Sequence, residues 1–177
     1  MRSLITDLLP HAPKMGLYVA PDIPERKLRG AVRDYAKGVH PEDVIALYDG
    51  TLLGNGKDGA VFLDDRLIFQ NSDFEPAQTV CYRDLVLLGT KQSRLRGTYI
   101  EMEVNRGRAT FSAKLDLSKH PDSLEYIERL LQKVMLLPEG SISDETDWNA
   151  VSRVLEGLRS SGKLTEADFR RLMNCRP

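Results

Sequence analysis

The segment with the most obvious chemical potential is 54–59, GNGKDG, which is followed by Val61 and so has the spacing GxGxxGxV. Such loops hold phosphates when a helix follows the third glycine, or when two strands flank the loop in a protein kinase. Here a short apolar strand is predicted after Gly59, which excludes the dinucleotide site, and 67–70 lacks the lysine that a kinase needs. We interpret the segment as a loop between strands, and a nucleotide-dependent enzyme is the weakest alternative.

No other set of residues predicts catalysis or metal binding. Cys81 and Cys175 lie far apart, without a CxxC or Cys/His cluster, so zinc fingers and disulfide frameworks are excluded. Asp64 and Asp65 are adjacent on a predicted hairpin tip, where neighbouring side chains point apart rather than face each other across a cleft. We therefore expect no enzymatic activity, no cofactor and no metal. The three histidines each precede a proline by one or two residues, as in turns: His11, His40 and His120.

The densest basic cluster is formed by Lys91, Arg94 and Arg96. A surface that binds single-stranded nucleic acid interleaves aromatic rings with such charges, and none lies between these three. Cations on a strand edge also protect it against aggregation. With a net charge of −1 and no block of one sign, the chain is not expected to bind nucleic acid.

The first 41 residues are expected to hold an arm and a helix. Three prolines within residues 1–22 indicate a loose arm with at most one helical turn at 4–9. After Pro24, apolar residues recur at the spacing of one helical face, and Gly38 ends the helix. That face is formed by Leu28, Ala31, Val32 and Tyr35, with Lys27, Arg29 and Arg33 away from it.

From residue 44 the pattern changes to short strands. In 99–104 and 109–117 apolar and polar residues alternate, which is typical of antiparallel strands with one wet face. Residues 121–123 then cap a helix over 124–135 with an apolar stripe. About seven strands are expected, at 44–48, 60–63, 67–69, 79–82, 85–88, 99–104 and 109–117.

The last 40 residues indicate a linker and two short helices. Residues 138–144 have linker composition, and apolar residues recur at helical spacing in 151–158 and 165–173. The chain of 177 residues suits one domain with a small appendage. Its longest apolar runs are far short of a membrane span, and its start turns polar too early for a signal peptide. We expect a bacterial cytoplasmic protein.

The order of about seven strands and one closing helix resembles a bacterial pleckstrin-homology-like or GRAM-like domain. The resemblance rests on the first-strand opening at 42–45, the strand-turn-strand segment 59–69, residues 82–85 in the fourth strand, and the closing helix. It implies an α+β fold, a PH-like antiparallel β-barrel over 42–137 whose open end is plugged by the helix.

The PH-like resemblance also implies that the loops after the first, third and sixth strands gather at the open end of the barrel. Lys57, Arg106 and Arg108 would then converge there as an anion or lipid-headgroup site, together with exposed glycine N–H groups. Acidic residues would lie nearby, and the phosphoinositide pattern of lysine and arginine is missing. A solvated rim of mixed charge is the alternative, with acids from Asp58, Asp73 and Glu75.

The tail is similar to the short helical hairpins called SHOCT domains. The resemblance rests on residues 155–169, LEGLRSSGKLTEADF, and implies an oligomerisation or docking element within 138–177. Here the second helix is shorter than in that family. The residues expected to dock a partner, or to pack the hairpin, are Trp148, Leu155, Leu158, Phe169 and Leu172.

Together these observations predict a non-enzymatic module that binds a protein partner or a second copy of itself. The first candidate surface is the groove between the fifth strand and the closing helix, where the PH-like resemblance implies that a peptide strand can be added. The second is the tail hairpin. Peripheral binding to an anionic lipid or a phosphate ligand through the three basic residues is the alternative from a different class.

Overall fold

The computed structural model describes residues 1–93, 97–137, 156, 159, 165 and 169. The chain divides into two units, Met1–Ile142 and Ser143–Pro177, which are described separately. The first unit is a mixed α+β fold with eight antiparallel strands in two sheets. Its helices are α1 Arg2–Leu8, α2 Glu25–Asp34 and α3 Leu124–Met135, with 3₁₀ turns η1 Pro13–Met15, η2 Pro41–Asp43, η3 Tyr82–Asp84 and η4 Pro121–Ser123.

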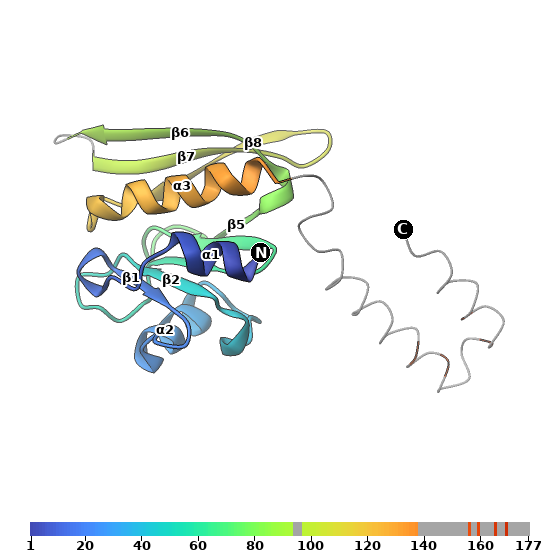
Figure 1. Cartoon of the computed structure of the whole chain (residues 1–177), viewed down its shortest axis with the longest axis horizontal. Helices are drawn as coiled ribbons and strands as arrows, with labels where there is room; N and C mark the ends of the chain where they lie inside the picture. The colour runs from blue at the N-terminus through green and yellow to red at the C-terminus, as the bar shows by residue number, and fades with distance from the viewer. Residues whose placement is uncertain (94–96, 138–155, 157–158, 160–164, 166–168, 170–177) are drawn as a thin grey trace. The chain divides into compact units, whose positions relative to one another are not determined.

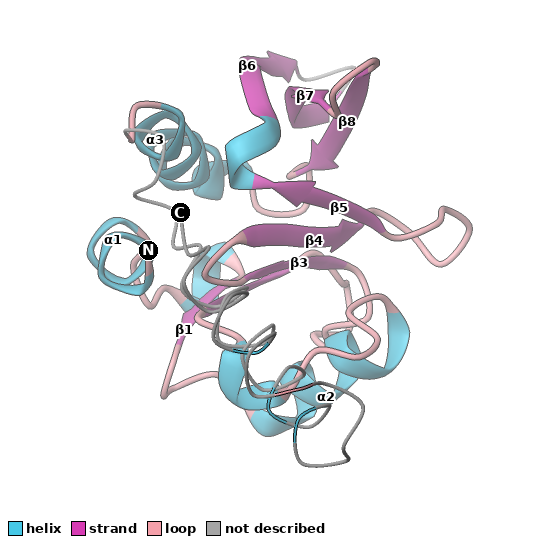
Figure 2. Cartoon of the chain, turned by 90° about the vertical axis from the view of Figure 1, so that its right-hand side faces the viewer, coloured by secondary structure: helices cyan, strands magenta, loops and turns pink. Residues whose placement is uncertain are grey.

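The strands form a five-stranded sheet and a three-stranded sheet, each in chain order. The first holds β1 Leu17–Val19, β2 Ala46–Asp49, β3 Gly59–Phe62, β4 Arg66–Gln70 and β5 Gln78–Cys81. The second holds β6 Leu85–Ser93, β7 Gly97–Asn105 and β8 Thr110–Asp116. In Figure 1, α3 runs beneath the three-stranded sheet, and α1 lies between α3 and the strands β1 and β2. Figure 2 shows α3 on the β6 side of that sheet.

Two apolar clusters hold these layers together. The larger lies between the two sheets, where Phe69 and Met102 meet the buried stripe of α3. The smaller lies on the opposite face of the five-stranded sheet, where Leu47 and Val61 pack against Ala31 and Tyr35. The five-stranded sheet is therefore covered on both faces, which is why every residue of β2 and β3 is buried instead of alternating between buried and exposed.

The prediction of a loose N-terminal arm is wrong. Residues 2–8 form α1 and residues 17–19 form β1, which pairs with β2 over Leu17↔Tyr48 to Val19↔Ala46. Ile5 and Leu17 are fully buried. Pairing with a strand nearly 30 residues away stabilises a segment whose own composition predicts no structure, and it makes the number of strands eight rather than about seven.

Three finer expectations also need correction. Residues 82–84 form η3 and do not belong to a fourth strand, because β5 ends at Cys81. Phe111 shares the inward face of Val104, as predicted, yet it is 53% exposed because it lies near the β7–β8 turn, outside the core. In the described residues the strands form two separate ladders, and a closed barrel is not present.

Candidate functional site

The glycine-rich segment is a loop between β2 and β3 that is fastened to α2. Lys27 of α2 forms an ion pair with the buried carboxylate of Asp49 and donates to the carbonyl of Gly54 at 2.9 Å. The Asp49 carboxylate also accepts from the amide and hydroxyl of Thr51, and that hydroxyl accepts from the Asn55 amide. Lys27, predicted to lie away from the packed face of its helix, is thus covered by this loop.

Two glycines are required where the loop meets the helix. A Cβ atom on Gly30 of α2 would lie 2.0 Å from the carbonyl oxygen of Asn55. A Cβ atom on Gly56 would lie 2.3 Å from the carbonyl oxygen of Lys27, and Gly56 has a φ of +73°. Close backbone approach therefore accounts for glycine here, as expected for a loop that joins strands, without a phosphate.

The three basic residues predicted to bind an anion have different partners in the structure. Lys57 lies 3.9 Å from the carboxylate of Asp34 in α2. Arg106 donates to the carbonyl of Thr79 in β5 and lies over the ring of Phe111. Arg108 is exposed in the β7–β8 turn. Lys57 and Arg106 therefore contact groups on different elements, α2 and β5.

Carboxylates dominate the surroundings of Lys57. Burial, and then the negative charge of Asp73, raise the pKa of the neighbouring Asp58 carboxyl, with smaller contributions from Asp34 and Asp49. The carboxylates of Asp73, Asp34 and Asp49 place negative charge around Asp58, and this charge disfavours a bound anion. The mixed-charge rim agrees better with these contacts than a headgroup site does.

Of the four sheet edges, three are covered by other parts of the chain. On β1, Ala12 exchanges backbone hydrogen bonds with Leu17, and the Val19 amide donates to Nδ1 of His11 at 3.5 Å. On β5, Arg106 covers the carbonyl of Thr79. On β8, Asn71 donates to the carbonyl of Lys114 at 2.8 Å and accepts from the amide of Asp116 at 2.9 Å. Each cover occupies backbone groups that would otherwise pair with another strand.

The fourth edge, that of β6, is open. From Val86 onward, the described backbone of this nine-residue strand has only β7 as a partner. Val86 and Leu87 are 47% and 54% exposed, next to a bulge in the β6–β7 ladder. Residues 85–90 carry no charge. Lys91, farther along, is held over the sheet face by Glu101 of β7, at 3.1 Å, rather than across the edge.

Helix α3 forms the second wall beside this open edge. It contacts β6 and, through its C-terminal half, η3, which directly precedes β6. The hydroxyl of Thr90 in β6 donates to Oε1 of Glu128 in α3 at 3.5 Å. Leu136, which is exposed, directly follows the C-terminal residue of α3. We call the β6 edge from Val86 to Thr90, with Glu128 and Leu136, the β6–α3 groove, because it joins the strand and the helix between which the first candidate surface was expected.

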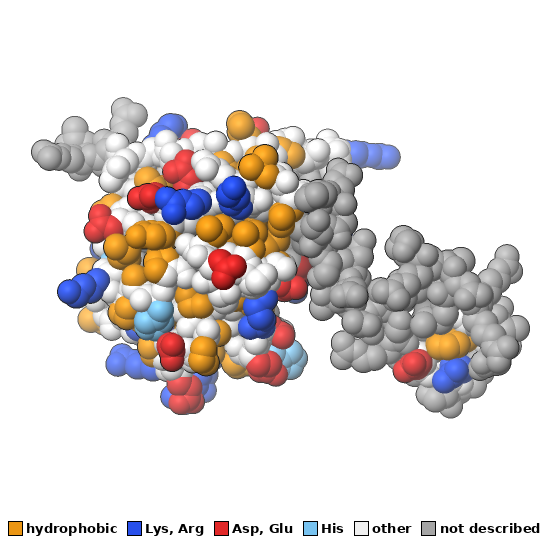
Figure 3. Space-filling view, viewed as in Figure 1, with side chains coloured by type: hydrophobic (Ala, Val, Ile, Leu, Met, Phe, Trp, Pro, Cys, Tyr) orange, Lys and Arg blue, Asp and Glu red, His pale blue; other side chains and the backbone are white. Residues whose placement is uncertain are grey.

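A second hollow, of about 410 Å³, lies between α1, β1 and α3. In Figure 3, apolar side chains form a band across this part of the molecule. Its wall includes His11, whose Nδ1 already accepts the hydrogen bond from β1. Its charged residues are exposed, and Arg129 is paired with Glu125. The lining residues are Thr6, Asp7, Leu8, Leu9, Pro10, His11, Val19, Ala20, Asp22, Tyr126 and Arg129.

Most of the predicted docking residues of the tail lie outside the described residues, namely Trp148, Leu155, Leu158 and Leu172. Phe169 is described and is 9% exposed. The guanidinium of Arg159 lies 4.3 Å from the centre of the Phe169 ring. The backbone amide of Phe169 donates to the carbonyl of Thr165. Within the second unit, Phe169 is therefore a packed side chain.

Among the described residues, no group of histidine, cysteine and acidic side chains could hold a metal ion. The described helices include none with the length and apolar character needed to cross a membrane. Comparisons with protein-family models, with curated proteins and with solved structures find no match. The candidate site therefore rests on its own geometry, and the β6–α3 groove is the strongest surface in the described part of the chain.

Proposed function

We propose that this protein is a non-enzymatic binding module that accepts an extended segment of a partner protein along the open edge of β6. The observation that carries the proposal is the contrast between the four sheet edges: β1, β5 and β8 have backbone groups bonded to other parts of the chain, and none of the described residues does this for β6 from Val86 onward. An added strand would pair with the free N–H and C=O groups of β6 and place alternate side chains against α3.

The fold supports the same proposal through the PH-like resemblance. Strands β2 to β8 followed by α3 keep the order of about seven strands and one closing helix on which the resemblance rests. β1 and α1 are additions to this order, and α1 packs beside α3. On this proposal, the PH-like domain provides a rigid frame, and the groove of its fifth strand and final helix provides the binding surface.

The groove can be tested without a known partner. A display library of random 12-residue peptides is selected on the immobilised full-length protein, and enriched peptides are measured by fluorescence anisotropy. We expect Leu87→Lys to weaken binding by about tenfold or more, because Leu87 is 54% exposed on the open edge strand and a lysine there opposes the addition of another strand.

Phe111→Lys is the matched control, since Phe111 is 53% exposed on the covered edge strand β8 against 54% for Leu87 on β6. It should bind the same peptides as the wild type. Peptides that bind Leu87→Lys with unchanged affinity would place the binding surface elsewhere and refute the proposal. Failure to enrich any peptide would refute it too.

A further inference from the structure

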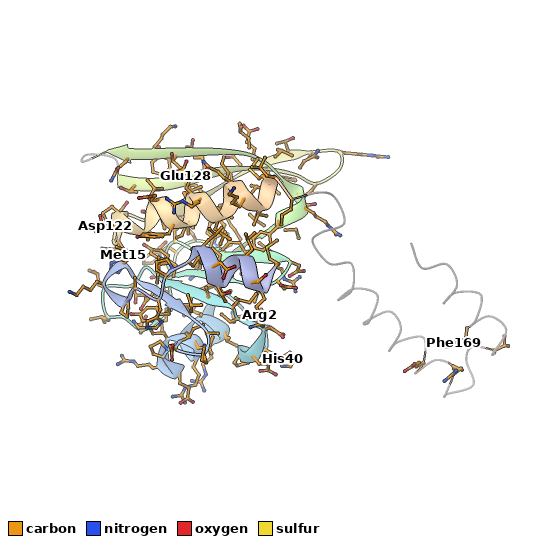
Figure 4. All side chains as sticks on the ribbon, in the orientation of Figure 1. Arg2, Met15, His40, Asp122, Glu128 and Phe169 are labelled. Carbon is orange, nitrogen blue, oxygen red and sulfur yellow. The ribbon has the colours of Figure 1, made fainter. Side chains whose placement is uncertain are left out.

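We infer that Asn55–Gly56 in the glycine-rich loop is a deamidation site that packing against α2 keeps closed. While the loop lies on α2, Asn55 keeps its side-chain amide. When the loop leaves α2, Asn55 is converted into aspartate or isoaspartate. The site is separate from the proposed binding surface, since in Figure 4 α2 lies at the lower end of the view, away from Glu128 of the β6–α3 groove.

The reaction needs only these two residues and water. The backbone nitrogen of Gly56 attacks Cγ of Asn55, the N–Cγ bond forms, the Cγ–Nδ2 bond breaks, and ammonia leaves with the proton of the Gly56 amide. Water then opens the succinimide ring at either carbonyl, which gives aspartate or isoaspartate. Glycine permits the attack because no side chain shields its nitrogen. Here the Gly56 N–H donates no hydrogen bond among the described residues, so the attacking atom is not occupied.

The backbone on both sides of the reactive bond is held in place. Ring closure requires rotation about the Cα–C bond of Asn55, because the five-membered ring needs a ψ outside the main allowed regions. That rotation must move either Gly56 or the amide of Asn55. A Cβ atom on Gly56 would lie 2.3 Å from the carbonyl oxygen of Lys27, so Gly56 is already in close contact with α2. The amide of Asn55 donates to Oγ1 of Thr51 at 2.9 Å.

The side chain and the carbonyl of Asn55 are held as well. Oδ1 accepts a hydrogen bond from the amide of Lys57 at 3.2 Å, which keeps the carboxamide in one orientation. The carbonyl oxygen lies against Gly30 of α2, where a Cβ atom would be only 2.0 Å away. The rotation is therefore blocked while the loop is in place, and the two hydrogen bonds of Asn55 must open before the attack.

The isoaspartyl product does not fit the position that Asn55 occupies. It has one additional backbone carbon between Cα of residue 55 and the nitrogen of Gly56. The contacts of this segment with Gly30 and Lys27 leave no space even for a methyl group. Because the longer backbone cannot repack on α2, the modification is a lasting chemical record that the loop has been released.

Mass spectrometry of the folded, full-length protein during incubation at neutral pH tests the inference. Trypsin releases residues 38–57, in which Asn55 is the only asparagine or glutamine, so a mass change from amide to acid is assigned to it. We expect the folded protein to react about thirtyfold more slowly than a synthetic peptide of residues 38–57, since the two hydrogen bonds contribute about a factor of five each. A folded protein that reacts as fast as the peptide would overturn the inference.

Two variants open the site from different sides, and circular dichroism checks that each is folded. Gly30→Ala displaces the carbonyl of Asn55, and Thr51→Val removes the hydroxyl that accepts from its amide. Each should accelerate the reaction about fivefold or more, the factor for one hydrogen bond. Thr51→Val alone decides the matter if Gly30→Ala does not fold. Rates equal to that of the wild type would overturn the inference.

Ile127→Ala is the matched control, because it lowers the global stability from a fully buried position in α3 without touching the loop. It should react as slowly as the wild type. If Ile127→Ala reacted as fast as Gly30→Ala and Thr51→Val, global unfolding rather than release of the loop from α2 would control the reaction. That result would also overturn the inference.

Discussion

Gly30→Ala gives the sharpest check on how the glycine loop and α2 are packed. In an exposed helix the substitution stabilises by about 0.5–1 kcal/mol, because alanine loses less backbone freedom on folding. In this protein, however, the added Cβ would lie 2.0 Å from the carbonyl oxygen of Asn55. Helix propensity would raise the free energy of unfolding of the Gly30→Ala variant, and the clash with Asn55 would lower it. The sign of the measured change therefore shows which effect is larger.

The magnitude follows from the distance. Real Cβ atoms do not approach within 3.0 Å, so Asn55 must retreat by at least the difference, 3.0 − 2.0 = 1.0 Å. That movement strains the Lys27–Gly54 hydrogen bond of 2.9 Å and the Asn55–Thr51 bond of 2.9 Å. Two hydrogen bonds contribute about 1 kcal/mol each, and overpacking costs about 1–3 kcal/mol. After the helix gain of about 0.5–1 kcal/mol is subtracted, we expect a net loss of about 2–4 kcal/mol.

Urea denaturation followed by circular dichroism measures this loss as a lower midpoint at unchanged slope. Arg29→Ala on the same helix, at an exposed position, is the control and should stay within about 0.5 kcal/mol of the wild type. If Gly30→Ala raised the free energy of unfolding as in an exposed helix, the loop would not lie against α2, and the account of its glycines would be refuted.

Two further predictions concern buried polar groups. Asp58→Asn should raise the Tm at pH 7 and lose this advantage below about pH 4. Because the fold raises the pKa of Asp58, protonated Asp58 stabilises the fold below the unfolded pKa of 3.8, and this stabilisation is lost as the pH rises through the folded pKa. Asparagine stays neutral at every pH, so its advantage is confined to the higher pH. A Tm gain at pH 3 equal to that at pH 7 would contradict the prediction. Tyr82→Phe should leave the free energy of unfolding unchanged or raise it by about 1 kcal/mol in urea titrations, because the buried hydroxyl has no partner among the described residues. A clear loss would reveal a partner.

The strands and helices that the sequence predicted are those with local patterns. Alternation in 99–104 leaves Ile100, Met102 and Val104 buried in β7, and the two-residue turn at Asp64 and Asp65 does join β3 to β4. The alternation and the turn both depend on residues that are close together in the sequence. Such signals survive in any fold that buries the apolar face.

The N-terminal segment was not predictable in this way. β1 is three residues long and follows several prolines, so nothing local indicates a strand. It exists because β2, whose Leu47 pairs with Tyr18 from 29 positions away, supplies backbone partners, and because α1 fills the core with Ile5. Tertiary context determines such a strand, and short-range patterns carry no information about it.

The same distinction explains what could be foreseen of the groove. The apolar patterns predicted the strand at 85–88 and the helix at 124–135, and the PH-like resemblance implied that they are neighbours. Neither gave any indication that Asn71 would cover β8 or that His11 would cover β1, since their partners are 45 and 8 residues away on other elements. Whether an edge is open can be decided only after all edges have been compared.

That comparison is also why the open edge of β6 argues for a partner. An exposed apolar edge promotes aggregation, and proteins normally blunt it with charge, proline or a covering segment. This chain uses covering groups on three edges, yet between Val86 and Thr90 it has neither charge nor proline. Lys91, the nearest cation, is drawn onto the sheet face by Glu101. A surface that requires protection in isolation, and that has a fixed acid at one end, is best explained by a segment that occupies it.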